Sequence, residues 1–264
     1  MPMKPKALVL LAYGTNRDHD VSEALALSGA DPEIVPLNAL HNDKIRWSEF
    51  HILVLPGGFS YADALGAGKL LGIDMLSYFS DEIQNFIAVG KPVIGICNGF
   101  QALVRSGILP APTRRAIGRD GSFTLTFNSH GHFECRWVVL KPVSQTCIWT
   151  KGLSELIACP IAHGEGNFQT LDQTGLAELQ SLGQIALAYV RADGGPANGE
   201  YPANPNGSML DIAGICNPEG NVLGLMPHPE NHIYPYQHPK WSRGAIMNSG
   251  LPLFRNGVKY AEER

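Results

Sequence analysis

At 264 residues, with 44% hydrophobic and 17% charged content, the chain is long enough for a substantial core and has an ordinary globular composition. Its net charge of -4, without any basic run, excludes a nucleic-acid-binding footprint, and no apolar run approaches the roughly 18 residues needed to span a membrane. The five cysteines include no C-x-x-C pair, which excludes a zinc ribbon or a thioredoxin motif. Their odd number, with no recognisable signal peptide, predicts a reducing, cytoplasmic location.

The first half of the chain alternates short apolar runs with helical patterns. We expect strands at 6–12, 33–37, 51–55 and 93–96, and helices at 21–27 and 69–89. This alternation predicts a doubly wound, mostly parallel α/β sheet with helices on both faces. Functional residues of such folds gather at the carboxyl ends of the strands. Gly14 to Asn16, the pair Gly57 and Gly58, and Cys97 all fall at such ends.

The second half has a different pattern, closer to antiparallel strands. Residues 123–127 and 133–140 alternate in this way. Shorter strands are expected at 156–161, 185–190, 211–215 and 222–225, and a loop rich in Pro, Gly and Asn at 196–207. Neither an internal repeat nor a linker separates the halves, so we expect one domain over residues 1–264. The pattern assigns no role to the C-terminal extension, residues 231–264.

The sequence between 93 and 103 has the form of a nucleophile elbow. Gly95-x-Cys97-x-Gly99 follows a short apolar strand and precedes a helix, with cysteine in the place of the usual serine. A sharp strand-to-helix turn brings the residues two before and two after the nucleophile together, which favours glycine at both positions. The helix N-terminus would favour the thiolate of Cys97. The alternative is a buried structural cysteine beside a helix cap.

A nucleophilic cysteine needs a base and a group that orients the base. His228 and Glu230 supply both on one stiff segment with two prolines, directly after the apolar strand 222–225. One alternative is a surface turn with an incidental ion pair. Another is a metal site formed by His228, Glu230, His232 and His238, although their spacing fits no recognised metal signature.

One glycine cluster, residues 66–69, must be tested as a phosphate site. A P-loop would need glycine where Asp63 stands and Ser or Thr where Leu70 stands. The dinucleotide fingerprint G-x-G-x-x-G fails as well, because Leu71 occupies its last position. The cluster therefore predicts a loop or a helix start, and no nucleotide site is expected in this chain.

Taken together, these motifs resemble the class I (triad) glutamine amidotransferases, whose fold is flavodoxin-like. Longer stretches resemble the glutaminase subunits of phosphoribosylformylglycinamidine synthase, the PurQ family of purine biosynthesis; they lie at 56–61, 94–101, 162–168, 211–214 and 224–230. The resemblance spans about residues 8–230. It departs from the family pattern at two positions, where the family often has glycine in place of Ala62 and arginine in place of His132.

The resemblance implies a role for each motif residue. Cys97 would attack the side-chain amide of glutamine, His228 would move protons, and Glu230 would orient His228. The backbone N–H groups of Gly58 and Asn98 would form the oxyanion hole. Further residues are expected at the site by resemblance: Gln101, Gly57 and Phe133 in glutamine binding, and His163, Gly164, Glu165 and Gly166 in a loop that lines the site or faces a partner.

The resemblance also implies partners. The ammonia would pass to a synthetase subunit that converts formylglycinamide ribonucleotide to formylglycinamidine ribonucleotide, with a small accessory subunit as a further candidate partner. ATP and Mg would bind the synthetase, and neither a cofactor nor a metal is expected in this chain. Other functions stay open: another triad amidotransferase subunit, a PfpI-like cysteine hydrolase, which would lack the His-Pro-Glu segment, or a non-catalytic module with a vestigial elbow.

Overall fold

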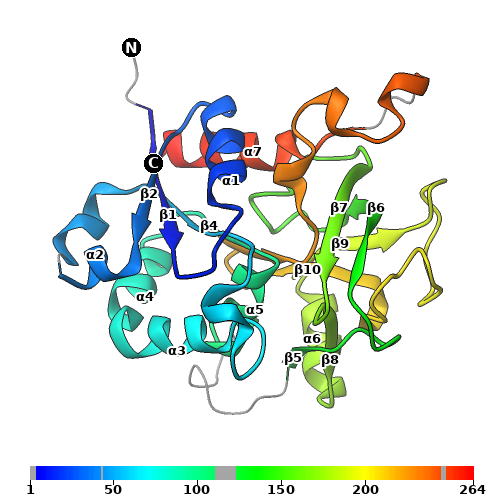
Figure 1. Cartoon of the computed structure of the whole chain (residues 1–264), viewed down its shortest axis with the longest axis horizontal. Helices are drawn as coiled ribbons and strands as arrows, with labels where there is room; N and C mark the ends of the chain where they lie inside the picture. The colour runs from blue at the N-terminus through cyan, green and yellow to red at the C-terminus, as the bar shows by residue number, and fades with distance from the viewer. Residues whose placement is uncertain (1–3, 43, 111–122, 245–247) are drawn as a thin grey trace.

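The computed structural model describes residues 4–42, 44–110, 123–244 and 248–264. Within these ranges a nine-stranded sheet runs through the molecule (Figure 1), in the order β2 (Asp31–Pro36), β1 (Lys6–Leu11), β3 (Ile52–Leu55), β4 (Val93–Ile96), β11 (Val222–Leu225), β10 (Ile212–Cys216), β9 (Ile185–Val190), β6 (Glu134–Pro142) and β7 (Ile157–His163). A small second sheet pairs β5 (Phe123–Thr126) with β8 (Asn167–Thr170).

The central sheet has two parts with different strand directions. The neighbours from β2 through β1, β3 and β4 to β11 are parallel. From β11 through β10, β9 and β6 to β7 the neighbours are antiparallel. This arrangement confirms the predicted α/β class, with antiparallel strands added by the second half of the chain. Every residue of β3, β4 and β11 is buried, as expected for parallel strands covered on both faces.

Helices cover both faces of the parallel part (Figure 1). On one face, α1 (Asp18–Leu27) packs against α7 (Leu251–Glu262), and on the other α3 (Lys69–Tyr78) packs against α5 (Asn98–Arg105). The remaining helices are α2 (Leu37–Asn42), α4 (Ser80–Ala88) and α6 (Gln173–Ser181). None of the helices in the described ranges combines the length and the apolar character needed to cross a membrane.

The expected helix over 69–89 is wrong in one respect, because the structure divides it into α3 and α4. Phe79 leaves the helical region, with φ -129° and ψ 13°, but its N–H still bonds Met75 O at 3.2 Å. Its ring stays in the core, 2% exposed. Since the apolar spacing continues across the break, periodicity alone could not reveal it.

The described part of the C-terminal extension packs against the rest of the fold. Its helix α7 buries Leu253, Phe254 and Val258, and it contacts both α1 and β3. Gly257 allows close packing, since a Cβ there would lie 2.1 Å from the Trp149 ring. Helices α2, α6 and α7 and strand β8 were not predicted from the sequence, because each is short or depends on distant packing partners.

Candidate active site

Cys97 occupies the turn between β4 and α5. Its backbone has φ 50° and ψ -104°, a strained conformation for a residue with a side chain. A Cβ on Gly95 would lie 2.8 Å from Gly99 O, and one on Gly99 would lie 2.0 Å from Leu55 O. The two glycines therefore meet across the turn, as a nucleophile elbow requires. The helix begins at Asn98, directly after Cys97, so the Cys97 side chain stands at the helix N-terminus.

The sheet register brings His228 to this turn. Strand β11 runs parallel to β4, and the Cys97 N–H donates to Leu225 O at 2.7 Å, so the segment after β11 emerges beside the elbow. The His228 N–H donates to Pro160 O at 2.8 Å, which fixes this segment against β7. His228 Nδ1 lies 2.6 Å from Glu230 Oε1, and both side chains are almost fully buried. The sequence segments 97 and 228–230 thus form one buried cluster.

The electrostatics of this cluster favour a charged imidazole. Burial lowers the pKa of His228, but the Glu230 carboxylate and the charge and hydrogen bond of the Cys97 sulfur outweigh it and raise the pKa to about 10. His228 is therefore cationic at neutral pH, with Glu230 on one ring nitrogen and Cys97 as its second side-chain partner. An imidazolium next to a sulfur stabilises the thiolate, which is the nucleophilic form of cysteine.

Gly57 and Gly58 pass close to the buried cluster of Cys97, His228 and Glu230. A Cβ on Gly57 would lie 2.7 Å from His228 Cε1, so the bare backbone at this position is what makes room for the imidazole. Gly58 has φ 136°, which only glycine adopts readily. The bridge between Thr15 and Gly58 uses groups on either side of Gly58, including the Phe59 N–H. The Gly58 N–H is thus outside this bridge, and that of Asn98, in the first turn of α5, has no acceptor within the helix.

The side chains of Asn98 and Gln101 tie the surrounding loops to α5. Asn98 Oδ1 accepts from the Ser60 N–H at 3.1 Å, and its Nδ2 donates to Asp63 at 3.0 Å and to Gln101 Oε1 at 3.2 Å. Gln101 Nε2 donates to Glu165 O at 2.6 Å. Gln101 is 4% exposed, and its two ends are already committed to protein partners. In this structure Gln101 therefore holds the loop at Glu165 against α5.

The loop 163–166 lies against the elbow from the β7 side. Ala162 O is 3.8 Å from Cys97 Sγ, which makes the end of β7 one wall of the site. His163 and Gly166 are buried, and Gly164 and Glu165 are half-buried. The loop therefore lines the site more than it faces outward.

Two asparagines that the sequence did not single out hold this loop. Asn128 Oδ1 accepts from the Gly166 N–H at 3.0 Å, and Asn206 Nδ2 donates to Gly166 O at 2.8 Å. Both are buried in the fold, yet the sequence places them in loop-like stretches, where asparagine is common for other reasons. No local pattern marked them as site residues.

Phe133 lies nearer the surface than the triad. Its ring is 49% exposed and stacks on Phe59, with 6.5 Å between centroids. Phe59 directly follows Gly58, and a Cβ on Gly164 would lie 3.8 Å from Phe133 Cδ2. The aromatic pair therefore stands where the two glycine-containing loops of the site come together.

The other cysteines differ from Cys97 in their surroundings. Cys135 is exposed on β6, whereas Cys147, Cys159 and Cys216 are buried. Burial, and then the nearby Glu230 charge, raise the pKa of Cys159 well above its usual value, so this thiol stays protonated.

A metal centre receives no support from the geometry. Among the residues that the structure describes, no three His, Cys, Asp or Glu side chains are arranged to hold a metal ion. His228 and Glu230 bond each other, and His232 Nδ1 donates to Ala158 O at 2.6 Å.

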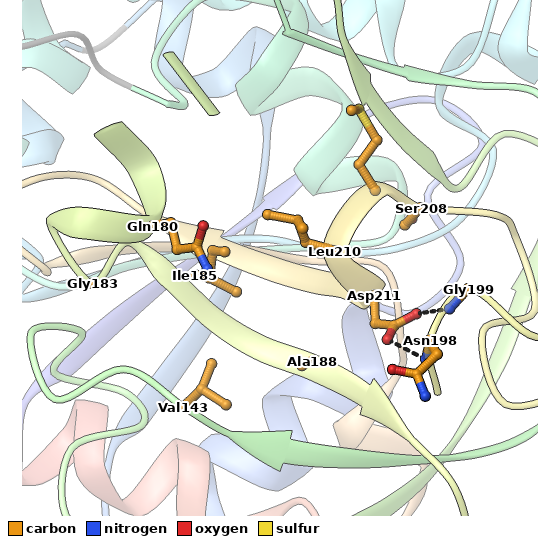
Figure 2. A pocket seen from close by; sticks show the side chains of 11 residues that line it. Val143, Gln180, Gly183, Ile185, Ala188, Asn198, Gly199, Ser208, Leu210 and Asp211 are labelled. Carbon is orange, nitrogen blue, oxygen red and sulfur yellow. Dashed lines mark hydrogen bonds between the residues drawn. The ribbon is translucent and has the colours of Figure 1, made fainter. Parts of the chain in front are cut away.

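A separate pocket of about 710 Å³ lies beside β9 (Figure 2), bordered by α6 and by residues 208–211. No triad residue lines it. Its one carboxylate, Asp211, accepts from the N–H groups of Asn198 and Gly199 at 2.8 Å each, the dashed lines of Figure 2. That charge is satisfied internally, and the pocket does not bring together a nucleophile and a base as the Cys97 cluster does.

Comparisons with known proteins find a matching domain family and relatives that align along the whole chain. A domain family described as the CobB/CobQ-like glutamine amidotransferase domain matches residues 4–261. The PurQ subunit of phosphoribosylformylglycinamidine synthase from Treponema denticola is 54% identical, over 98% of this chain and 99% of the relative. The corresponding subunit from Dehalococcoides mccartyi is 42% identical, over 98% and 99%.

Solved structures give the same result. A chain of the structure of PurLQS from Thermotoga maritima superposes with a TM-score of 0.73 at 32% identity, covering 98% of this chain and 99% of that chain. A glutamine amidotransferase from the same organism, at 14% identity and a TM-score of 0.56, shares the fold, with coverage of 99% and 100%.

Proposed function

The chain belongs to the CobB/CobQ-like glutamine amidotransferase family, and on that premise we propose that it is the glutaminase subunit of a phosphoribosylformylglycinamidine synthase. It hydrolyses glutamine to glutamate and ammonia and supplies the ammonia for converting formylglycinamide ribonucleotide to formylglycinamidine ribonucleotide in purine biosynthesis. The observation that carries the reaction is the buried cluster of Cys97 with the His228–Glu230 pair, whose ring nitrogen and carboxylate oxygen are 2.6 Å apart. Relatives along the full chain support the pathway assignment.

In the first half-reaction, Cys97 Sγ attacks the side-chain carbonyl carbon of glutamine. The C–N bond then breaks, the nitrogen takes a proton from His228, and neutral ammonia leaves behind a glutamyl thioester on Cys97. The raised pKa of His228 means that the proton is on the imidazole before attack, when the thiolate is needed. In the second half-reaction His228 accepts a proton from the attacking water, and glutamate leaves the regenerated sulfur.

The N–H groups of Gly58 and Asn98 are proposed to bind the oxyanion of both tetrahedral intermediates. Removing one such donor typically costs about 10²- to 10³-fold in rate. The Asn98 side chain holds the loop that follows Gly58, through its bond to the Ser60 N–H. One residue therefore supplies a donor and fixes the loop that carries the other.

Ammonia delivery requires a partner. Amidation of formylglycinamide ribonucleotide needs ATP and Mg, and the sequence has no phosphate-binding loop, so we assign both to a synthetase subunit. A small accessory subunit is a further expected member of the complex, as the PurLQS composition of the Thermotoga structure suggests. A cytoplasmic location follows from the pathway.

The interface with the synthetase is proposed to include the exposed aromatic rings around the site. Phe59 and Phe133 stack on each other at 45% and 49% exposure, and Tyr13, 81% exposed, is joined to the same region by the bond from the Tyr61 N–H to Tyr13 O. Exposed aromatic clusters of this kind are typical of binding hot spots. Docking there would also order the loop that carries Gly58, so glutaminase activity should be low alone and rise in the complex.

The test is glutamate release by the purified chain, measured alone and then with synthetase, formylglycinamide ribonucleotide and ATP. We expect weak activity alone and a rise with the full set. Full activity without any response to the synthetase would contradict the coupling, and tight ATP binding by the isolated chain would contradict the division of labour.

A further inference from the structure

His163 carries a buried nitrogen that the proposed reaction does not use. The residue is 3% exposed, at the end of β7, and its Nδ1 lies 3.1 Å from Asn128 Oδ1. Its Nε2 is buried, and no group in the described part of the chain hydrogen-bonds to it. Leaving a buried polar atom unpaired costs about 1–3 kcal/mol, so such an atom calls for an explanation beyond packing.

The hydrogen-bond network fixes the tautomer of His163. Asn128 Nδ2 donates to His132 O at 3.0 Å and to His163 O at 2.8 Å, so its Oδ1 is the acceptor. That oxygen accepts from the Gly166 N–H at 3.0 Å and from His163 Nδ1. The proton of the neutral ring is therefore on Nδ1, and Nε2 is a bare lone pair.

This imidazole also remains neutral. Burial, and then the charge of His228, lower the pKa of His163 to about 3. The two histidines of the site thus have opposite properties: His228 holds a proton that it can give, whereas His163 can accept a hydrogen bond but has no proton on Nε2 to give.

One backbone contact of the neighbouring residue and two electrostatic interactions place His163 in the same cluster as Cys97, His228 and Glu230. The adjacent residue, Ala162, has its carbonyl oxygen 3.8 Å from Cys97 Sγ. Along β7, His163 shares a face with Cys159, and these two side chains interact electrostatically with His228 and Glu230 respectively.

The glycine after Glu165 fixes the imidazole from one side. A Cβ on Gly166 would lie 2.2 to 2.7 Å from three atoms of the His163 ring. The backbone of Gly166 therefore covers the ring closely.

We propose that His163 Nε2 accepts a hydrogen bond from the ammonia that leaves the Cys97 thioester, and so holds ammonia in its neutral form beside the acylated sulfur. The inference rests on the proposed glutaminase reaction. Ammonia is about the size of water and has three N–H groups, any of which can donate to such an acceptor. As the C–N bond breaks, His228 provides the proton that completes NH₃. His163 provides only an acceptor, so it cannot convert NH₃ to the unreactive ammonium ion.

The test uses the partition of the thioester between water and an amine. By microscopic reversibility, a site that holds departing ammonia also holds an attacking amine, so hydroxylamine serves as the probe and γ-glutamyl hydroxamate as its product. In His163→Asn, the amide N–H₂ retains a donor to Asn128, but the acceptor at the Nε2 position is gone. We expect the hydroxamate-to-glutamate ratio of the complex to fall about three- to tenfold, the equivalent of one hydrogen bond.

The ratio is independent of the amount of folded enzyme, so a purely structural role of His163 would change the total rate and leave the ratio intact. The matched control is His41→Asn, the same substitution at an exposed histidine of α2 away from the site, for which the ratio should equal that of the wild type. An unchanged ratio in His163→Asn would overturn the inference, and so would a rise, which would mean that His163 serves the attacking water. Absence of glutamate from the wild-type complex would instead contradict the proposed function itself.

A second measurement does not depend on the folding of His163→Asn. In the Cys97→Ser variant with a ¹⁵N-labelled imidazole, ammonia added at pH 9 should shift the His163 Nε2 resonance, because a bare nitrogen that accepts a hydrogen bond becomes more shielded. A resonance that does not move over the ammonia titration would overturn the inference.

Discussion

Two clusters at opposite ends of the central sheet differ in whether their buried polar groups are hydrogen-bonded. At the carboxyl end of β4, Cys97 has a strained φ of 50°, and polar atoms of His163, Glu230 and Ser60 are buried without a hydrogen-bond partner among the described residues. At the opposite end, Asn221 Nδ2 donates to Ile87 O and to Lys91 O, both at 3.0 Å.

At this opposite end, the hydrogen bonds of Asn221 extend into a network in which each polar group has a partner. Asn217 Nδ2 donates to Asn221 Oδ1 at 2.8 Å, and the Val222 N–H donates to Asn217 Oδ1 at 2.9 Å. The strained turn and the unpaired atoms around Cys97 therefore lie where the proposed chemistry takes place, whereas the asparagine network at the other end closes its hydrogen bonds and stabilises the sheet.

The largest expected effect tests the nucleophile. Cys97→Ala should lower glutamate formation in the complex by about 10⁴-fold or more, because covalent catalysis is lost. Cys135→Ser, at an exposed thiol, is the matched control and should retain wild-type activity. A glutamine-analogue electrophile should label Cys97, as detected by mass spectrometry of the digested protein. Labelling of Cys216 and not of Cys97 would contradict the assignment of Cys97 as the nucleophile.

The next effect tests the orienting carboxylate. Glu230→Gln should reduce kcat by about 10²- to 10⁴-fold, because the imidazolium loses its buried counter-charge and the ring its fixed orientation. The pKa of His228 should fall in this variant, since burial then acts with less opposition. NMR titration of the imidazole measures this shift directly. An imidazole still charged at pH 8 in Glu230→Gln would contradict the role given to Glu230.

The raised pKa of His228 also predicts how stability depends on pH. A raised pKa contributes stability that is complete below the ordinary value of 6.5 and is lost as the pH rises through about 10. From pH 7 to 10 this group should therefore lower the free energy of unfolding by at most about 1.4 kcal/mol per pH unit. Denaturant unfolding at several pH values measures the slope, which should be shallower in Glu230→Gln. Equal slopes in the two proteins would refute the shifted titration.

A smaller effect is expected from crowding the imidazole. Gly57→Ala would place a Cβ 2.7 Å from His228 Cε1, so the ring must shift from its position between Glu230 and Cys97. We expect kcat to fall about 10²-fold, the cost of a misplacement of about 1 Å, with the fold retained. Gly131→Ala is a comparison on an exposed loop, where a Cβ meets nothing within 4 Å; its positive φ gives some strain, but kcat should not change. Equal kcat values for the two variants would contradict the contact.

The smallest effect on catalysis should come from the opposite end of the sheet. Asn221→Ala removes two partly buried hydrogen bonds to backbone carbonyls, and we expect about 2–3 kcal/mol of destabilisation with kcat unchanged. Urea unfolding and steady-state kinetics below the transition measure the two quantities. A drop in kcat without loss of stability would remove the separation between the two ends.

Much of the site was predictable because its signals are local. The spacing of Gly95, Cys97 and Gly99 reflects contacts within one turn, and His228 and Glu230 lie two residues apart. Asn128 and Asn206 were not predictable, because they hold Gly166 from segments about 40 residues away on either side. The break at Phe79 was hidden for another reason, since the apolar spacing continues through it.

The α/β class and the local geometry of the elbow follow from the sequence, since both depend on the order of residues within one strand, turn or helix. Which side chains meet depends on the tertiary structure. The parallel register of β4 with β11 brings the His228 segment to Cys97 across about 130 residues. The bond from the His228 N–H to Pro160 O brings in β7, and with it His163. These are long-range backbone pairings, and no local residue pattern encodes which strands become neighbours.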